Sequence, residues 1–178
     1  AVPAGRSAPA EAAALLFRHR TRQGASRAPR RRLPRLPVAA RAPDAGEDYT
    51  ALAAKYPTPP ASAGLVKRDG FAELNEEAFL RDFAGDLDPA RARILYAVQG
   101  RVATSLFASR TTQAAWRGKP SWYAVSTQDR TINPDLQRFM AQRMGATTIE
   151  LAASHVSLIS RPAEVADLIL AAAGRKTG

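Results

Sequence analysis

Two side chains that can share a proton, Asp129 and His155, each follow a short apolar run near the C-terminus. Residues 122–126 form a β-favouring run that ends three residues before Asp129, and residues 147–151 form a second run that ends four residues before His155. A carboxylate held beside an imidazole fixes the ring tautomer and stabilises the protonated ring, as the orienting acid of a general base does. The two residues are therefore a candidate catalytic acid–base pair.

The same two residues also have an ordinary structural interpretation. Aspartate is common in turns after strands, because its side chain bonds the backbone that follows it. An isolated histidine in a loop is often without function. Short motifs match many unrelated proteins by chance, so the spacing alone leaves both interpretations open.

A helix between the two runs would bring their loops together. It is predicted to begin at Asn133-Pro134, because asparagine caps free N–H groups and proline suits the first helical position, and to end before Gly145. Strand, helix and strand then form a βαβ unit with parallel strands, and the loops at their carboxyl ends can touch. A last helix is predicted to open at residues 160–162. The apolar stripes of the two helices are Leu136, Phe139, Met140 and Met144, and Val165, Leu168, Ile169 and Ala172.

Residues 45–118 are predicted to be mostly helical. Helices are expected over 49–55, after Asn75, after Asp88-Pro89 and over 111–116, with an extended stretch at the prolines of residues 57–60. The two central helices carry the apolar sets Phe79, Phe83 and Leu87, and Ile94, Leu95, Val98 and Val102.

The composition excludes several kinds of site. The 178 residues include no cysteine, which rules out disulfides and zinc–thiolate sites, and the only histidines are His19 and His155. No glycine-rich phosphate loop, EF-hand loop or HExxH motif is present. No apolar run approaches the roughly 20 residues of a membrane span. We therefore expect no metal, no cofactor and no membrane span, and a cytoplasmic location.

The net charge of +10 is concentrated at one end of the chain. Residues 1–41 hold ten arginines and a single acidic residue, Glu11, whereas residues 42–178 carry a net charge of only +1. The run RAPRRRLPR at 27–35 can grip phosphates without sequence preference, although no recognition helix or stacking aromatic accompanies it. Its Ala/Pro/Arg-rich composition predicts that residues 1–41 are disordered or irregular.

The C-terminal stretch resembles a known family. Residues 119–169, KPSWYAVSTQDRTINPDLQRFMAQRMGATTIELAASHVSLISRPAEVADLI, resemble the C-terminal part of the α/β-hydrolase fold. The likeness is greatest to small bacterial, cofactor-free, esterase-like hydrolases related to plant methylesterases and hydroxynitrile lyases. It extends upstream to about Ala39, where AARAPDAGED is similar to the segment after the family's sixth strand.

The resemblance implies a fold class and roles for particular residues. Asp129 matches the family's triad acid, His155 matches its triad base, and residues 45–118 match the lid. In such enzymes the histidine takes a proton from a serine hydroxyl, the serine attacks an ester carbonyl, and backbone N–H groups hold the oxyanion. The implied fold is α/β, with a helical lid block followed by a parallel βαβ-α unit, so that 42–178 is a partial domain.

The nucleophile-bearing half of the family has no counterpart in this sequence. The motif Gly-x-Ser-x-Gly occurs nowhere in the 178 residues. We interpret residues 1 to about 38 as coding sequence read out of frame; a gene fragment or a fusion is the competing explanation.

The sequence thus predicts a hydrolase-family chain whose intact relatives act on small carboxylic esters. It carries the acid and the base without the serine, and we expect a truncated or inactive form. Two alternatives stay open: a basic module that binds nucleic acid or anionic surfaces through its Arg-rich segment, and a non-catalytic binding protein that keeps the lid pocket.

Overall fold

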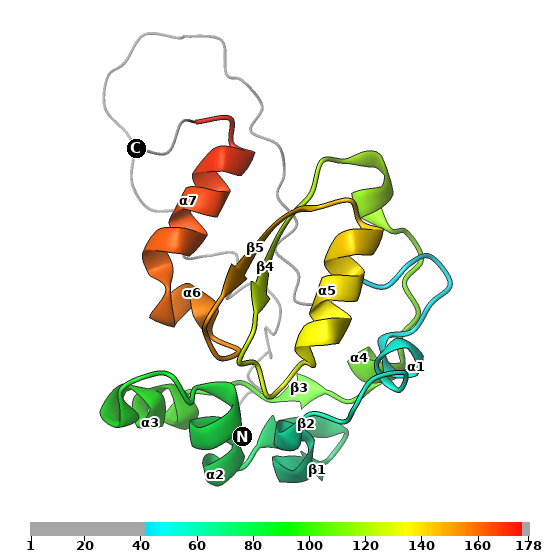
Figure 1. The fold of residues 1–178 in the computed structure, drawn as a ribbon. Helices are drawn as coiled ribbons and strands as arrows, with labels where there is room; N and C mark the ends of the chain where they lie inside the picture. The colour runs from blue at the N-terminus through cyan, green and yellow to red at the C-terminus, as the bar shows by residue number, and fades with distance from the viewer. Residues whose placement is uncertain (1–41, 176–178) are drawn as a thin grey trace, which may run out of the picture. The chain divides into compact units, whose positions relative to one another are not determined.

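The structure is a computed structural model of the chain, and it describes residues 42–175. The Arg-rich segment 1–41 lies outside the described residues, and so do its predicted disorder and its suggested role in binding anions. Within the described residues, the elements divide into a C-terminal βαβ-α unit and an upstream region of short helices and strands (Figure 1).

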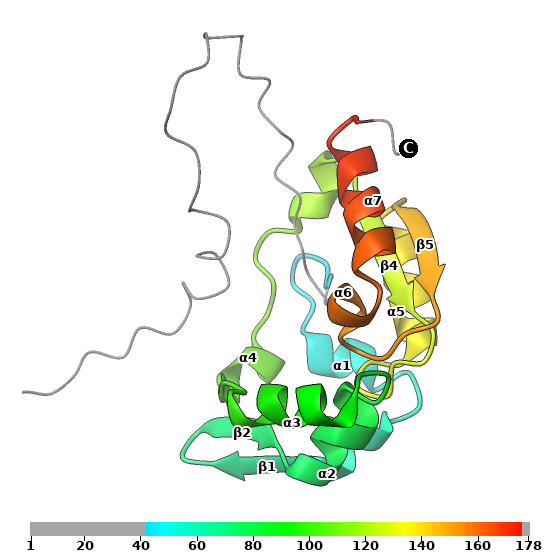
Figure 2. The same ribbon diagram turned by 90° about the vertical axis from the view of Figure 1, so that its left-hand side faces the viewer.

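The C-terminal unit has the predicted strands and helices in the predicted order, with one short helix, at residues 157–160, that was not predicted. In chain order these are β4 (Trp122–Ser126), α5 (Pro134–Arg143), β5 (Thr147–Leu151), α6 (Ser157–Ser160) and α7 (Pro162–Ala172). β4 and β5 pair in parallel, with Trp122 opposite Thr147 and Ser126 opposite Leu151. α5 and α7 lie on opposite faces of this sheet, as Figures 1 and 2 both show.

The local signals around α5 explain its bounds. The Asn133 side chain accepts a hydrogen bond from the N–H of Asp135 at 2.8 Å, and Gly145 adopts a φ of +57° just after the helix. Leu136 and Met140 are fully buried, whereas Phe139 remains partly exposed and contacts the ring of Tyr56. The core beneath α5 consists of Ala42, Leu52, Tyr123, Val125, Ile132, Leu136, Met140 and Ala141.

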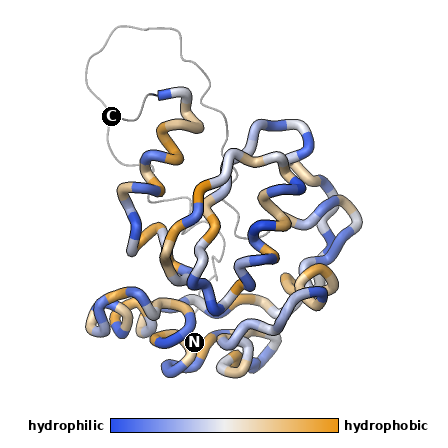
Figure 3. Tube along the Cα trace, viewed as in Figure 1, coloured by the Kyte–Doolittle hydropathy of each residue, from blue (hydrophilic) through white to orange (hydrophobic). Residues whose placement is uncertain are grey.

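The apolar stripe of α7 is only partly covered. Ala172 is buried, Val165 and Leu168 are half-buried, and Ile169 is 43% exposed. Hydrophobic and hydrophilic residues alternate along this helix (Figure 3).

The upstream region contains a sheet that the sequence did not lead us to expect. β1 (Leu65–Arg68), β2 (Phe71–Leu74) and β3 (Val102–Ala103) pair antiparallel. Asp69 and Gly70 connect the first two strands with positive φ values of 51° and 76°, the geometry that an Asp-Gly hairpin turn requires. The other elements are α1 (Tyr49–Ala53), η2 (Pro60–Gly64), α2 (Glu76–Ala78), η3 (Phe79–Phe83), α3 (Pro89–Ala97), α4 (Ser105–Ala108) and η4 (Ala115–Gly118).

Two predictions about this region are wrong in detail. The helix expected over 111–116 is absent; α4 precedes that stretch and η4 overlaps only its end. The stripe expected to run from Ile94 to Val102 stops with α3, because the side chain of Gln99 bonds the backbone N–H and C=O of Leu74 and turns the chain toward β2. Ile94, within α3, and Val98, just after it, are both exposed.

The segment after Asn75 begins as predicted and then widens into a π-helical turn. Asn75 accepts a hydrogen bond from the N–H of Ala78, and the N–H of Ala84 bonds the carbonyl of Phe79, five residues back. Leu87, expected on the same helix, lies beyond its end. A second core of Phe79, Ala84, Ala92 and Val156 packs η3 and α3 against the chain that follows β5.

Candidate active site

The loops after β4 and β5 start side by side. The parallel ladder continues beyond the strands, since the N–H of Thr127 bonds the carbonyl of Leu151 at 2.9 Å and the N–H of Gln128 bonds that of Ala153 at 3.1 Å. Asp129 and His155 therefore leave neighbouring loops at the same edge of the sheet. His155 Nδ1 lies 2.9 Å from Asp129 Oδ2, so the structure brings the two predicted residues together.

The carboxylate of Asp129 is held by four hydrogen bonds. Oδ1 accepts from the backbone N–H groups of Thr131 at 2.7 Å and Ile132 at 3.0 Å. Oδ2 accepts from Gln137 Nε2 at 2.8 Å and faces His155. The residue is only 7% exposed, so these bonds replace its hydration and fix its orientation.

Gln137 is a site residue that our sequence reasoning missed. Its side chain also accepts from the N–H of Ser126 at 3.0 Å and donates to the carbonyl of Ile132 at 3.1 Å, so one amide ties β4, the acid loop and α5 together. It is buried on the face of α5 that carries Leu136 and Met140. A polar residue within an apolar helical stripe is the signal that would have found it.

The surroundings of His155 define its tautomer. Every other partner of the Asp129 carboxylate is an N–H donor, so the carboxylate acts as acceptor and His155 Nδ1 carries the shared proton. Nε2 then presents a lone pair, and it has no hydrogen-bond partner among residues 42–175. The ring packs against Phe83 at 4.8 Å between centroids, and its side chain is 19% exposed.

Two carboxylates flank the pair, the fully buried Asp82 and the exposed Asp86. Asp82 accepts hydrogen bonds from Arg81 and Arg130, and these guanidinium groups hold the pKa of Asp82 below its usual range despite burial. Partial desolvation raises the pKa of Asp86, but hydrogen-bond donors, the hydroxyl and N–H of Ser154 first among them, outweigh that effect and leave the pKa lowered.

The core residue Tyr123 has a phenol group whose pKa is influenced by Asp129. Burial, and secondarily the charges of Tyr49 and Asp129, raise the pKa of Tyr123 well above that of an exposed tyrosine. Tyr123 is therefore a neutral core group at physiological pH.

The described residues bring no metal-binding group of three or more His, Asp or Glu side chains together. In the same part of the chain, every helix is too short or too polar to span a bilayer. What the site offers chemically is a fixed imidazole with a free lone pair, which can remove a proton from a hydroxyl or from water.

Comparison with solved structures shows a shared fold. Polyneuridine aldehyde esterase superposes with a TM-score of 0.57 at 14% identity, covering 72% of this chain and 57% of that enzyme. A mutant of the same enzyme gives a TM-score of 0.56 with the same identity and coverage. The chain thus spans 57% of the length of these structures. No curated protein sequence matches it.

A sequence model described as the alpha/beta hydrolase family matches residues 4–168, a range that includes most of the Arg-rich segment. Since that match covers far more than half of the 178 residues and the fold agrees with it, the chain belongs to the alpha/beta hydrolase family.

Proposed function

We propose that Asp129 and His155 are the acid and the base of a hydrolytic site for small carboxylic esters. The observation that carries this proposal is the 2.9 Å contact between His155 Nδ1 and the buried, fourfold bonded carboxylate of Asp129. Membership of the hydrolase family and the fold shared with an esterase support the reaction class.

In this proposal His155 Nε2 accepts the proton of the attacking hydroxyl group. Asp129 keeps the ring in the required tautomer and stabilises the imidazolium that forms. The imidazolium then returns the proton to the leaving alkoxide, so that ester and water become acid and alcohol.

The nucleophile is the component that the sequence does not supply in its usual form. Gly-x-Ser-x-Gly is absent from the 178 residues, and no hydroxyl among the described residues bonds His155. We therefore propose that this chain activates water only, without a covalent acyl-enzyme. General-base assistance of this kind contributes about 10²–10⁴-fold, well short of the rate that a complete triad gives.

The test is hydrolysis of a nitrophenyl ester by the full chain, compared with His155→Gln and Asp129→Asn. We expect slow turnover without a burst of nitrophenol, and at least about a tenfold loss in each variant. Gln142→Asn, on the exposed face of α5, serves as the matched control and should hydrolyse at the wild-type rate.

Two outcomes would count against the proposal. Equal rates for wild type and His155→Gln would remove the pair from the chemistry. A burst together with covalent labelling by a fluorophosphonate would show that the chain holds its own activated serine, and the water-only step would be wrong.

A further inference from the structure

The π-helical turn η3 and the residues just after it contact both loops of the candidate site. Asp82 and Phe83 end this turn, and Asp86 follows three residues later. We propose that residues 82–86 form a clamp that sets the distance between Asp129 and His155, and that Asp82 and Asp86 are positioning residues for the pair. The effect of this clamp on catalysis rests on the proposed function, whereas its effect on the contact between Asp129 and His155 does not.

One arm of the clamp holds the acid loop. The side chain of Asp82 is fully buried and accepts from Arg130 Nε at 2.6 Å. Its backbone carbonyl accepts from the hydroxyl of Thr131 at 3.3 Å. Arg130 and Thr131 directly follow Asp129, and the N–H of Thr131 bonds the Asp129 carboxylate, so a shift of Asp82 is passed on to the acid.

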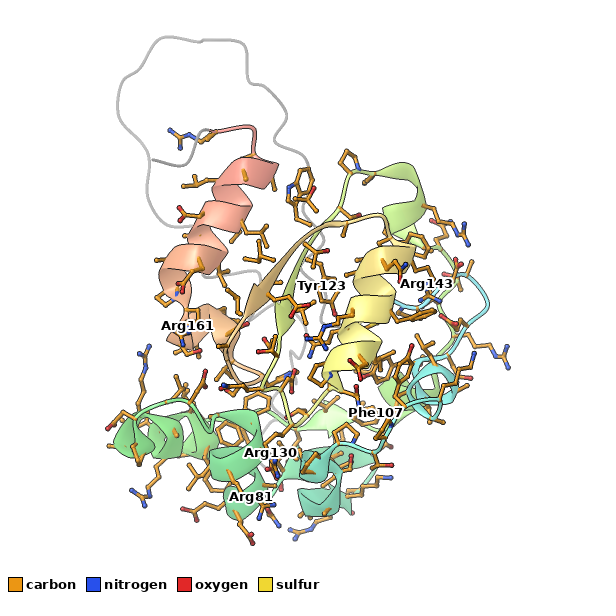
Figure 4. The ribbon with its side chains drawn as sticks, viewed as in Figure 1. Arg81, Phe107, Tyr123, Arg130, Arg143 and Arg161 are labelled. Atoms are coloured by element: carbon orange, nitrogen blue, oxygen red, sulfur yellow. The ribbon has the colours of Figure 1, made fainter. Side chains whose placement is uncertain are left out.

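The guanidinium groups around Asp82 are arranged to keep it ionised. Arg81 donates to the same carboxylate through Nε at 3.1 Å and through a terminal nitrogen at 2.9 Å. Figure 4 labels Arg81 and Arg130, which reach this carboxylate from η3 and from the loop after β4. A buried charge with partners from two segments holds those segments in one arrangement, because separating them would leave the charge unpaired.

The other arm holds the base loop. The Asp86 carboxylate accepts from the N–H of Ser154 at 2.9 Å and from its hydroxyl, and that hydroxyl also lies 3.0 Å from the carbonyl of Phe83. Ser154 directly precedes His155, and the ring of Phe83 packs on the imidazole. This one segment therefore contacts both the residue directly before the histidine and the ring of the histidine itself.

The two arms are only four residues apart on the chain and rest on one π-helical turn. Both loops extend past the last hydrogen bonds between the parallel strands, so the strands alone do not fix the loops relative to each other. Anchoring both loops to residues 82–86 does so. Separate anchoring of each loop would leave the Nδ1–Oδ2 distance to vary with the loops.

The experiment measures the Nδ1–H proton of His155 by nitrogen-edited NMR of the full chain, with the signal assigned by its loss in His155→Gln. A hydrogen bond to a carboxylate shifts this proton far downfield and slows its exchange. We expect the signal in the wild type and its loss or broadening in Asp82→Asn and in Asp86→Asn, while the cooperative unfolding transition persists. His155-dependent ester hydrolysis should fall about tenfold or more, because misplacing a catalytic group by about 1 Å can cost about a hundredfold.

Asp44→Asn is the matched control. Asp44 binds Arg117 through both carboxylate oxygens, as Asp82 binds its arginines, but it lies away from the pair. We expect the signal to be unchanged in this variant. If Asp82→Asn does not fold, the half-exposed Arg130 replaces it in the test: Arg130→Gln should weaken the signal and Arg130→Lys should restore part of it.

The results separate two kinds of failure. An unchanged signal in folded Asp82→Asn, or in Arg130→Gln, and in Asp86→Asn would overturn the clamp. A missing signal in the wild type would overturn the Asp129–His155 pair itself, and with it the proposed function.

Discussion

At the scale of single residues, the site depends on how the Asp129 carboxylate is satisfied. Asparagine could occupy the same space, but it would present an N–H₂ group to at least one N–H donor. Gln137 is the least replaceable of the neighbours, because its amide bonds Ser126, Ile132 and Asp129 at once while it is 4% exposed.

Replacing Gln137 by methionine tests this role. The apolar side chain fits the volume but leaves the N–H of Ser126 and the carbonyl of Ile132 without their partner. We expect a loss of at least about 2 kcal/mol in the free energy of unfolding, measured by urea denaturation. Gln142→Met, at an exposed position of the same helix, is the control and should change stability by less than about 0.5 kcal/mol. Equal effects of the two substitutions would contradict the assigned role.

Asp129 and His155 could be predicted from the sequence, but the residues that support them could not. Each of the two lies only a few residues after a run that is recognisable as a strand from the sequence alone. Asp82 and Asp86 are linked to the site by contacts across 48 and 68 residues, and such contacts leave no local pattern.

At the scale of elements, the bounds of β4, α5 and β5 follow from local signals. An Asn-Pro start, a glycine stop and two β-branched or aromatic runs suffice, because the βαβ unit is stabilised by near neighbours in sequence. The upstream region depends more on contacts between residues that are distant in sequence. Its third strand pairs with β2 across some thirty residues, and α3 ends just before Gln99, whose side chain bonds the backbone of Leu74.

The turn after η3 makes a specific demand on Gly85. A Cβ atom at this position would lie 2.4 Å from the backbone carbonyl oxygen of Arg81, closer than real side chains come. We expect Gly85→Ala to destabilise the protein by about 1–3 kcal/mol in denaturant unfolding, because the backbone between Asp82 and Asp86 must shift.

Gly100→Ala is the matched control for this prediction, since an added Cβ there meets no atom within 4 Å. It should leave stability unchanged or slightly raised. A neutral Gly85→Ala would show that the turn accommodates a side chain and that the close approach is not limiting.

At the scale of the whole molecule, charge and fold are separated along the chain. Residues 1–41 supply +9 of the +10 net charge, whereas the described site lies within 82–155. Among the described residues, β4 pairs only with β5, and the chain spans 57% of the length of the esterase structures that share its fold.

This separation predicts where anions bind. Retention of the chain on a polyanionic matrix should depend on salt and should largely disappear when residues 1–41 are deleted, because the remaining net charge is only +1. The salt concentration needed for elution measures the effect, and Lys119→Gln in the full chain is a control that should shift it little. Undiminished retention of the shortened chain would place the anion-binding surface on the described region.

The most direct test of the central claim is the position of the proton on the neutral ring of His155. Nitrogen NMR of the labelled full chain distinguishes a protonated Nδ1 from a protonated Nε2. The geometry predicts a proton on Nδ1, bonded to Asp129, with a bare Nε2, and a redistribution between the two nitrogens in Asp129→Asn. A proton on Nε2 in the wild type, or a tautomer that Asp129→Asn leaves unchanged, would contradict an acid–base pair at this site.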